Sequence, residues 1–311
     1  MKALRAVSVA NTVVMLAAVL WGAWVTSSES GDGCGASWPL CKGTFMPEWD
    51  YAAIVEFGHR VVSALAGLFS IVVLIWVLRA LPAAVRLKRL AFGTFFFVVL
   101  QGALGAAAVL WPQPDLVMAL HFGFSLLCFT FALLVTVALG EAVREDRPAA
   151  PPAPGEAAPA EAVDPGLRTI IWGTAVYTYL VIYLGAYVRH IGASLACMGW
   201  PLCNGELWPT LYGPVGANFA HRLGAALGVL LVLRLWWAVR QSGRRDLRRG
   251  ASWALAFMLA QVASGALFPL GYLNLLTQLL HTTCISGFWA VLSYLCYRTL
   301  PARPAAVAVS A

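Results

Sequence analysis

Glu56-Phe57-Gly58-His59-Arg60 is the stretch that decides the fold, together with its later counterpart Asn218-Phe219-Ala220-His221-Arg222. Each stretch places a histidine in the opening turns of a long apolar segment. A side chain that can carry charge or bind a metal is costly inside a membrane, so its presence there calls for a functional explanation. The recurrence of the pattern also predicts a duplicated chain.

The composition predicts an integral membrane protein. The chain has 311 residues, of which 60% are hydrophobic and 11% charged, and its mean hydropathy is +0.77. Its apolar runs are long enough to cross the ~30 Å hydrocarbon core of a bilayer as helices. A net charge of +7 could indicate nucleic-acid binding, but the basic residues lie in short loops between apolar spans rather than on one soluble face. We therefore expect membrane lipid, and no nucleic acid, as a partner.

The apolar runs predict eight transmembrane helices, with an error of about two to four residues at each end. They span 7–26, 53–79, 90–110, 117–140, 167–189, 215–239, 251–270 and 274–298. The first run follows Lys2 and Arg5, as a signal peptide would. It ends without a convincing small-residue cleavage site, so we expect a retained helix.

The distribution of basic residues predicts the orientation. Most of the 21 Lys and Arg residues fall in one set of connections, at 2–5, 79–89, 144–168, 240–249 and 298–303. The loops of the opposite set contain Lys42 and Arg189. By the positive-inside rule, we expect a multi-pass protein of the plasma membrane with both termini in the cytoplasm.

Two long outer loops, at 27–52 and 190–214, each carry a cysteine pair around a Trp-Pro-Leu segment. On the oxidising side of the membrane, this close spacing favours two local disulfides, Cys34–Cys41 and Cys197–Cys203. Free thiols, transient redox chemistry and a shared zinc site are the alternatives. The other cysteines lie within helices, where we expect packing residues.

Equivalent residues recur at nearly constant separations. Those 162 apart are Trp38 and Trp200, Cys41 and Cys203, and His59 and His221; those 160 apart are Gln101 and Gln261, Gly105 and Gly265, and His121 and His281. The chain is therefore predicted to be an all-α integral membrane protein built from two parallel four-helix-bundle repeats, 1–140 and 167–299, related by a pseudo-two-fold axis along the membrane normal. Between them, 141–166 is rich in Ala, Pro and Glu, as a disordered cytoplasmic linker would be. Residues 300–311 are expected to form a cytoplasmic tail.

Four of the five histidines occupy equivalent places near the outer ends of the predicted helices. They are His59, His121, His221 and His281. Helical rise places all four roughly 6–12 Å below the outer surface. A lone membrane histidine is commonly a packing residue, but two at one depth in each repeat favour two bis-histidine haem sites, His59 with His121 and His221 with His281. Zinc usually needs a third or fourth ligand close by, and none of these helices carries a second histidine at short spacing.

The charged residues beside these histidines have two interpretations each. Arg60 and Arg222 could pair with haem propionates or extend to lipid headgroups. Glu56 projects from nearly the same helix face as His59, so it could serve in proton transfer or electrostatic stabilisation, or it could simply partner Arg60. Because the second repeat has Asn218 in this place, we expect one site to be equipped for chemistry and the other to pass electrons.

Together these motifs resemble the haem A synthase family, the membrane enzymes that oxidise haem O to haem A for cytochrome oxidase assembly. The resemblance covers 7–140 and 167–299. It rests on the stretch at 56–60, on the cysteine segments at 34–41 and 188–203, and on the Leu-His pairs at 120–121 and 280–281. The cysteine pairs match the bacterial branch of the family, in which the first pair forms a disulfide with a proposed part in haem transfer.

The resemblance implies a division of labour. The amino-terminal half would bind haem O through His59 and His121 and oxidise its C8 methyl to a formyl group, with Glu56 as the catalytic residue. The carboxy-terminal half would hold a haem b cofactor between His221 and His281. Quinol is the candidate electron donor, and a haem O synthase is a candidate partner. The sequence leaves open whether an axial ligand of the substrate haem is exchanged or Glu56 stabilises a positively charged intermediate at the oxidised carbon.

Two other functions fit part of the pattern. A dihaem cytochrome b-type protein that transfers electrons from quinol would explain the four histidines and the duplication, but it gives Glu56 no role. A parallel-repeat transporter would place its site between broken helices near the bilayer midplane, away from the predicted histidine layer.

Overall fold

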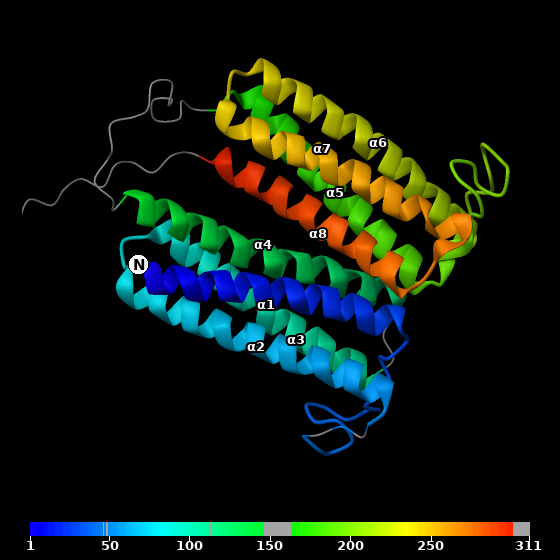
Figure 1. Cartoon of the computed structure of the whole chain (residues 1–311), viewed down its shortest axis with the longest axis horizontal. Helices are drawn as coiled ribbons and strands as arrows, with labels where there is room; N and C mark the ends of the chain where they lie inside the picture. Colours follow the sequence, from blue (N-terminus) through cyan, green and yellow to red (C-terminus); the bar gives the residue numbers. More distant parts are fainter. Residues whose placement is uncertain (46, 48, 112–113, 146–162, 301–311) are drawn as a thin grey trace, which may run out of the picture.

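The computed structural model describes residues 1–45, 47, 49–111, 114–145 and 163–300, and within these ranges the chain is all-α (Figure 1). It forms eight long helices. Their bounds are α1 Lys2–Ser27, α2 Tyr51–Ala80, α3 Val85–Leu110, α4 Asp115–Glu145, α5 Pro165–His190, α6 Gly213–Gln241, α7 Arg245–Ala266 and α8 Leu275–Arg298. A short 3₁₀ helix, η1 (Ala193–Leu195), follows α5, and a π-helical turn, η2 (Phe268–Tyr272), follows α7.

Seven of these helices in the described part of the chain are long and apolar enough to cross a membrane, as a multi-pass membrane protein requires. The exception is α7, whose first turns carry Arg245, Asp246 and two further arginines. Its uncharged part, 250–266, is shorter than the ~20 residues that a span needs. The π-helical turn η2 adds residues at the loop end of α7. That α7 crosses the membrane as an eighth span stays a prediction.

The helix ends differ from the sequence expectation mainly at the starts. Helices α1, α3 and α7 begin at Lys2, Val85 and Arg245 rather than near 7, 90 and 251, because Lys and Arg are good helix formers and extend the helices beyond their apolar parts. Helix α7 ends at Ala266 instead of 270, because Pro269 and Gly271, with φ of 95°, distort the turn that follows.

The segment expected to be a linker is partly helical. Helix α4 continues through 141–145, and α5 begins at Pro165, where the Asp164 side chain accepts a 2.9 Å hydrogen bond from the Leu167 N–H and so caps the helix. The remainder of this segment, 146–162, and the tail from 301 lie outside the described residues.

The helices form two groups of four, α1–α4 and α5–α8. Helices α1 and α3 each contact both α2 and α4, while α5 and α7 each contact both α6 and α8. It follows that α2 and α4 occupy opposite corners of the first group, and α6 and α8 opposite corners of the second. In Figure 1 the first group lies below the second, and the loops that precede α2 and α6 leave the same end of the bundle, which we call the loop end. The pseudo-two-fold relation between the groups stays a prediction.

Contacts of α4 with α5 and α8, and of α1 with α8, join the two groups. Their shared apolar core includes Leu126, Phe129 and Leu292, all buried. Near the loop end, Arg189 Nη2 donates a 2.9 Å hydrogen bond to the carbonyl oxygen of Thr26. This carbonyl is among the last four of α1, which lack a partner within the helix, so Arg189 caps the end of a helix in the other group.

Candidate functional site

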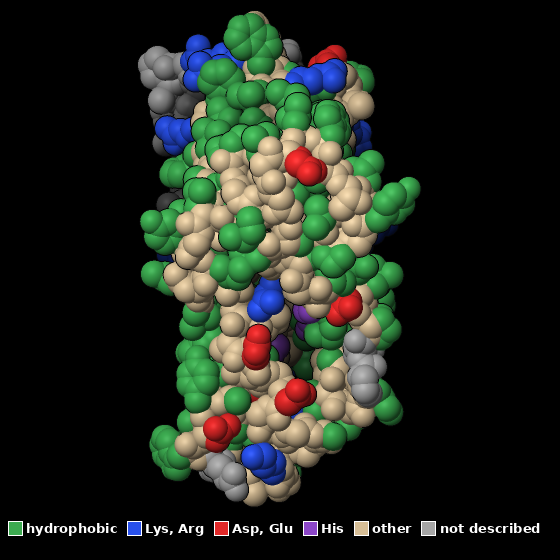
Figure 2. All heavy atoms as spheres, turned by 90° about the vertical axis from the view of Figure 1, so that its right-hand side faces the viewer, with side chains coloured by type: hydrophobic (Ala, Val, Ile, Leu, Met, Phe, Trp, Pro, Cys, Tyr) green, Lys and Arg blue, Asp and Glu red, His purple; other side chains and the backbone are tan. Residues whose placement is uncertain are grey.

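A large cavity lies near the loop end and is lined by residues of both helix groups. Its volume is about 1560 Å³, which exceeds the ~300–1,000 Å³ typical of a pocket for one small molecule. Figure 2 shows the loop end hollowed, with histidine side chains visible inside the hollow. All five histidines line this cavity, so the structure gathers the expected site residues in one place.

Each expected histidine pair comes from opposite corners of one helix group. His59 on α2 and His121 on α4 line the cavity within electrostatic range of each other, and the same holds for His221 on α6 and His281 on α8. Within the described ranges, no three His, Cys, Asp or Glu side chains converge closely enough to hold a metal ion by themselves. Each pair therefore suits a group that brings its other metal ligands with it, as a porphyrin does.

Every one of the four rings lies against a glycine of a neighbouring odd-numbered helix. A Cβ added at these glycines would lie 3.1 Å from the ring for Gly22 and His59, 2.7 Å for Gly185 and His221, 3.8 Å for Gly105 and His121, and 3.0 Å for Gly265 and His281. The sequence had indicated Gly105 and Gly265 only as repeated positions. Gly22 and Gly185 were missed, although their separation of 163 residues was the signal that could have found them.

The surroundings of the rings fit a haem with two axial imidazoles. Nδ1 of His121 and Nδ1 of His221 are buried without a hydrogen-bond partner, which is unusual for buried polar atoms and typical of functional sites. Phe122 and Phe288 contribute apolar walls to the cavity. Paired, buried imidazoles in an apolar cavity supply what a six-coordinate porphyrin iron needs from a protein.

His281 differs from the other rings because both of its nitrogens are hydrogen-bonded. Nδ1 lies 2.9 Å from Ser264 Oγ, and Nε2 lies 2.9 Å from Gln261 Nε2. In the first group, Gln101 Nε2 instead donates to the backbone carbonyl of His121 at 2.6 Å. Both glutamines thus make interhelical hydrogen bonds, but to different atoms of the equivalent histidines.

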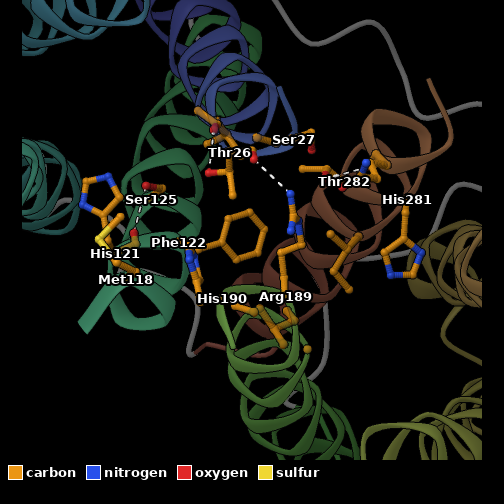
Figure 3. Close-up of a pocket in the computed structure, with 18 of the residues that line it drawn as sticks. Thr26, Ser27, Met118, His121, Phe122, Ser125, Arg189, His190, His281 and Thr282 are labelled. Atoms are coloured by element: carbon orange, nitrogen blue, oxygen red, sulfur yellow. Dashed lines mark hydrogen bonds between the residues drawn. The ribbon is translucent and has the colours of Figure 1, made fainter. Parts of the chain in front are cut away.

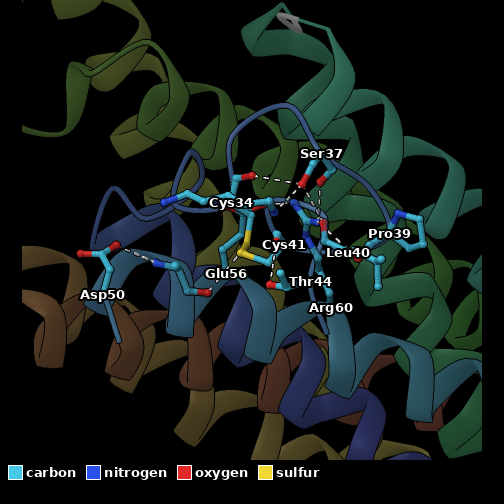
Figure 4. The surroundings of a disulfide bond; sticks show 11 residues. Cys34, Ser37, Pro39, Leu40, Cys41, Thr44, Asp50, Glu56 and Arg60 are labelled. Carbon is cyan, nitrogen blue, oxygen red and sulfur yellow. Dashed lines mark hydrogen bonds and ion pairs between the residues drawn. A yellow bond between two sulfur atoms is a disulfide. The ribbon is translucent and has the colours of Figure 1, made fainter. Parts of the chain in front are cut away.

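Glu56 lines the cavity and is only 4% exposed, yet both of its carboxylate oxygens are engaged (Figure 4). Oε2 accepts a 2.8 Å hydrogen bond from the backbone N–H of Cys34, and Oε1 forms an ion pair with Arg60. The structure therefore shows the partnership with Arg60 that was one of the two interpretations of this residue. A role in chemistry stays a prediction.

Asn218 makes the corresponding contacts with reversed polarity. Its Nδ2 donates to the carbonyl oxygens of Ala193 at 2.7 Å and Ser194 at 3.1 Å, while its Oδ1 accepts from Arg222 Nε at 3.0 Å. The first loop presents the Cys34 N–H to Glu56, whereas the second presents the carbonyl oxygens of Ala193 and Ser194 to Asn218. A carboxylate suits the first and an amide the second, so the Glu-to-Asn difference has a structural cause in addition to any chemical one.

Arg60 and Arg222 hold the two cysteine loops against the bundle. Arg60 Nη1 donates to the carbonyl oxygens of Ser37 at 2.7 Å and Leu40 at 2.8 Å, and Arg222 Nη1 to those of Gly199 at 2.8 Å and Leu202 at 3.0 Å. Each arginine directly follows a histidine, so the loops are fixed to the histidine helices. Contact of either arginine with haem propionates stays a prediction.

Both expected disulfides are confirmed. Cys34 is bonded to Cys41 and Cys197 to Cys203. The other cysteines of the described residues, Cys128, Cys284 and Cys296, are free and buried, as expected of packing residues.

Arg189 and His190, at the end of α5, also line the cavity. Figure 3 shows them with His121 on one side and His281 on the other, and with Arg189 bonded to Thr26. The sequence assigned no function to His190, yet the structure places it in the cavity wall.

Comparisons with known proteins show the family of this chain. A family model described as "Cytochrome oxidase assembly protein" matches residues 48–293. The "Heme A synthase" of Symbiobacterium thermophilum is 79% identical over 312 residues, which cover 100% of both chains. Proteins of the same name are 40% identical in Geobacillus kaustophilus and 39% in Exiguobacterium sp.. These matches cover 96% and 92% of this chain, and 92% and 90% of the respective relatives.

Proposed function

The chain belongs to the haem A synthase family, membrane oxidoreductases that convert haem O to haem A, and we propose that its two helix groups divide this reaction between them. The amino-terminal group, 1–140, receives haem O between His59 and His121, and the C8 methyl group becomes a formyl group there. The carboxy-terminal group, 167–299, holds haem b between His221 and His281.

The observation that carries the proposal is the presence of two facing histidine pairs in one cavity. Each pair comes from diagonal helices of one group, and each ring rests against a glycine, with little room for a larger residue beside His59, His221 and His281. Since the same cavity reaches both pairs, electrons can pass between two bound haems without leaving the protein.

Glycines line the part of the cavity between α2 and α3, which we call the slot. They support placing the substrate in the first group. Gly67 and Gly102 line the cavity there, whereas the equivalent positions between α6 and α7 are Val229 and Val262. A Cβ at Gly102 would meet nothing within 4 Å, so close helix packing does not explain this glycine. Haem O is bulkier than haem b because it carries a long isoprenoid chain, and the wider slot suits the bulkier molecule.

The roles of the chain's own residues follow from their positions. Haem b, when bound, supplies one-electron transfer. Arg60 and the Cys34 N–H fix the Glu56 carboxylate one helical turn from His59. A carboxylate held there can stabilise positive charge that develops at the oxidised carbon. The apolar lining of the cavity limits the access of water to that carbon.

Orientation and partners belong to the same proposal. Disulfides form on the oxidising side of a bacterial membrane, which favours the loop end as the outer end. Basic residues gather in the connections at the opposite end, which favours cytoplasmic termini. Quinol as electron donor and a haem O synthase as the source of substrate stay predictions from the family resemblance.

Pigment extraction from purified histidine variants tests the division. In cells that make haem O, we expect the wild-type protein to yield haem A and to retain haem b. His221→Ala and His281→Ala should lose the haem b absorption, whereas His59→Ala and His121→Ala should keep it and form no haem A. The opposite pattern would reverse the assignment of the two groups. Haem b alone, with no effect on cellular haem A, would support an electron carrier instead.

A further inference from the structure

We infer that Ser264 is a positioning residue of the haem b site, where it holds the His281 imidazole in the tautomer and orientation that present Nε2 to the iron. The inference rests on the proposed function, because it takes His281 to be a ligand of haem b. Ser264 lies on α7 and His281 on α8, so the contact also joins two neighbouring helices.

The hydrogen bonds around Ser264 suit the tautomer of His281 that a metal ion requires. Ser264 Oγ donates its single hydrogen to the backbone carbonyl of Gln261 at 3.0 Å. In this arrangement Oγ has lone pairs left to accept from His281 Nδ1, 2.9 Å away. With the proton on Nδ1 donated to Ser264 Oγ, Nε2 keeps the lone pair and lies 2.9 Å from Gln261 Nε2, which can donate to it. A lone pair on a neutral imidazole nitrogen is what a metal ion requires.

Burial makes this contact effective. Ser264 is 3% exposed, so water does not compete for its hydroxyl oxygen. A metal-bound histidine that donates its second N–H to a fixed acceptor is held in one ring orientation and is a stronger donor to the metal. Only the Gln261 amide has to move for an iron ion to take its place at Nε2.

The first helix group has no equivalent of the contact between Ser264 and His281. The position that corresponds to Ser264 is Leu104, whose side chain cannot accept a hydrogen bond. Accordingly, Nδ1 of His121 is buried without a partner. Ser125 and Gln101 instead bond the backbone carbonyl of His121, at 3.0 and 2.6 Å.

The two groups therefore treat equivalent rings differently. His121 is held through its backbone carbonyl and its Nδ1 has no hydrogen-bond partner, whereas both ring nitrogens of His281 are hydrogen-bonded. A fixed ligand suits a cofactor that stays bound through many reactions. A ligand that can turn suits a site that must admit haem O and release haem A.

Substitutions at Ser264 with and without the hydroxyl test the inference. Ser264→Thr and Ser264→Val have nearly the same shape, but only threonine keeps an acceptor for Nδ1. Ser264→Ala removes the hydroxyl without adding volume. The control is Ser286→Ala, which removes a buried hydroxyl that bonds only the Thr282 carbonyl on the same helix as His281. The measurements are the haem b content of the purified full-length protein and the reduction potential of that haem by optical titration.

We expect Ser264→Ala and Ser264→Val to bind haem b roughly 10- to 100-fold more weakly. The haem that remains should have a more positive reduction potential, because a weaker imidazole donor stabilises ferric iron less. Ser264→Thr and Ser286→Ala should keep the wild-type potential. A merely structural role would lower the haem content of Ser264→Ala without shifting the potential.

Two results would overturn the inference. One is an unchanged potential in Ser264→Ala or Ser264→Val, and the other is an equal shift in Ser264→Thr and Ser264→Val. If Ser264→Ala does not accumulate, the threonine and valine pair still decides the question. Haem b absorption that survives His281→Ala would instead overturn the proposed function, so the two failures can be told apart.

Discussion

Glu56 and Cys34 are joined by a 2.8 Å hydrogen bond from the backbone N–H of Cys34 to Oε2 of Glu56, which ties the first disulfide loop to α2 one turn from His59. Asn218 ties the second loop to α6 with opposite polarity, since its Nδ2 donates to the carbonyl oxygens of Ala193 and Ser194. Trp38 and Trp200, which lie within these loops, line the cavity. The cysteine loops are therefore part of the site wall.

Glu56→Gln should lower both stability and haem A formation. The amide keeps an acceptor for the Cys34 N–H but loses the ion pair with Arg60, and breaking a buried ion pair costs about 3–5 kcal/mol. We expect haem A to fall at least about tenfold, with haem O or a hydroxylated product accumulating. Haem analysis and thermal unfolding of the same preparation measure both effects. A wild-type rate of haem A formation per folded protein would assign Glu56 to the loop alone.

Gly185→Ala should reduce the haem b content. The new methyl group would lie 2.7 Å from His221 Cε1, so the ring must shift, and overpacking of this kind costs about 1–3 kcal/mol. Gly173→Ala on the same helix is the matched control, because its Cβ would meet nothing within 4 Å. Absorption spectra of the purified variants compare their haem b. Equal haem b in both variants would show that the glycine is not needed beside the ring.

Gly102→Val should impair haem O conversion and leave haem b in place. Valine is the residue that the second group carries at this position, and it would narrow the slot between α2 and α3. The expected cost of about 1–3 kcal/mol corresponds to roughly 5- to 150-fold weaker binding of haem O. The control is Ala103→Val, at the adjacent exposed position. Titration of each variant with haem O measures the difference, and equal affinities would contradict a role for the slot in substrate choice.

Replacing Cys34 and Cys41 together by serine should affect the substrate half selectively. A disulfide of this kind typically contributes about 2–4 kcal/mol, and its loss frees the loop that Arg60 and Glu56 hold. We expect less haem A with haem b retained. The matched variant at Cys197 and Cys203 should instead loosen haem b. Haem A yield and haem b absorption are measured in both double variants. The same changes in both variants would contradict this prediction.

Much of this arrangement could be predicted from the sequence. Apolar length located the helices, and equal spacing indicated the four histidines that line one cavity, because membrane helices have few polar residues. The cysteine spacing likewise gave both disulfides. Helix ends were less accessible, since α1, α3 and α7 continue through charged residues that hydropathy assigns to loops.

The contacts that shape the site could not be predicted in the same way. Arg60 was expected to face propionates or lipid, but it bonds loop carbonyls whose positions depend on the folded loop. Ser264 is one of many serines in apolar helices, and only the packing of α7 on α8 brings it to His281. The role of Gly22 depends on the ring of His59, which lies against it from the next helix. Each of these depends on a neighbour in space rather than in sequence.

The shared cavity also determines what happens when the two halves of the chain are separated. Its wall combines Phe122 and Ser125 of α4 with Tyr177 and Ile182 of α5, so separating the halves would strip each of surface that the other covers. Two half-chains that are expressed separately should regain activity only when they associate, because neither half alone has the complete cavity wall. The cavity is complete only when both halves contribute to its wall.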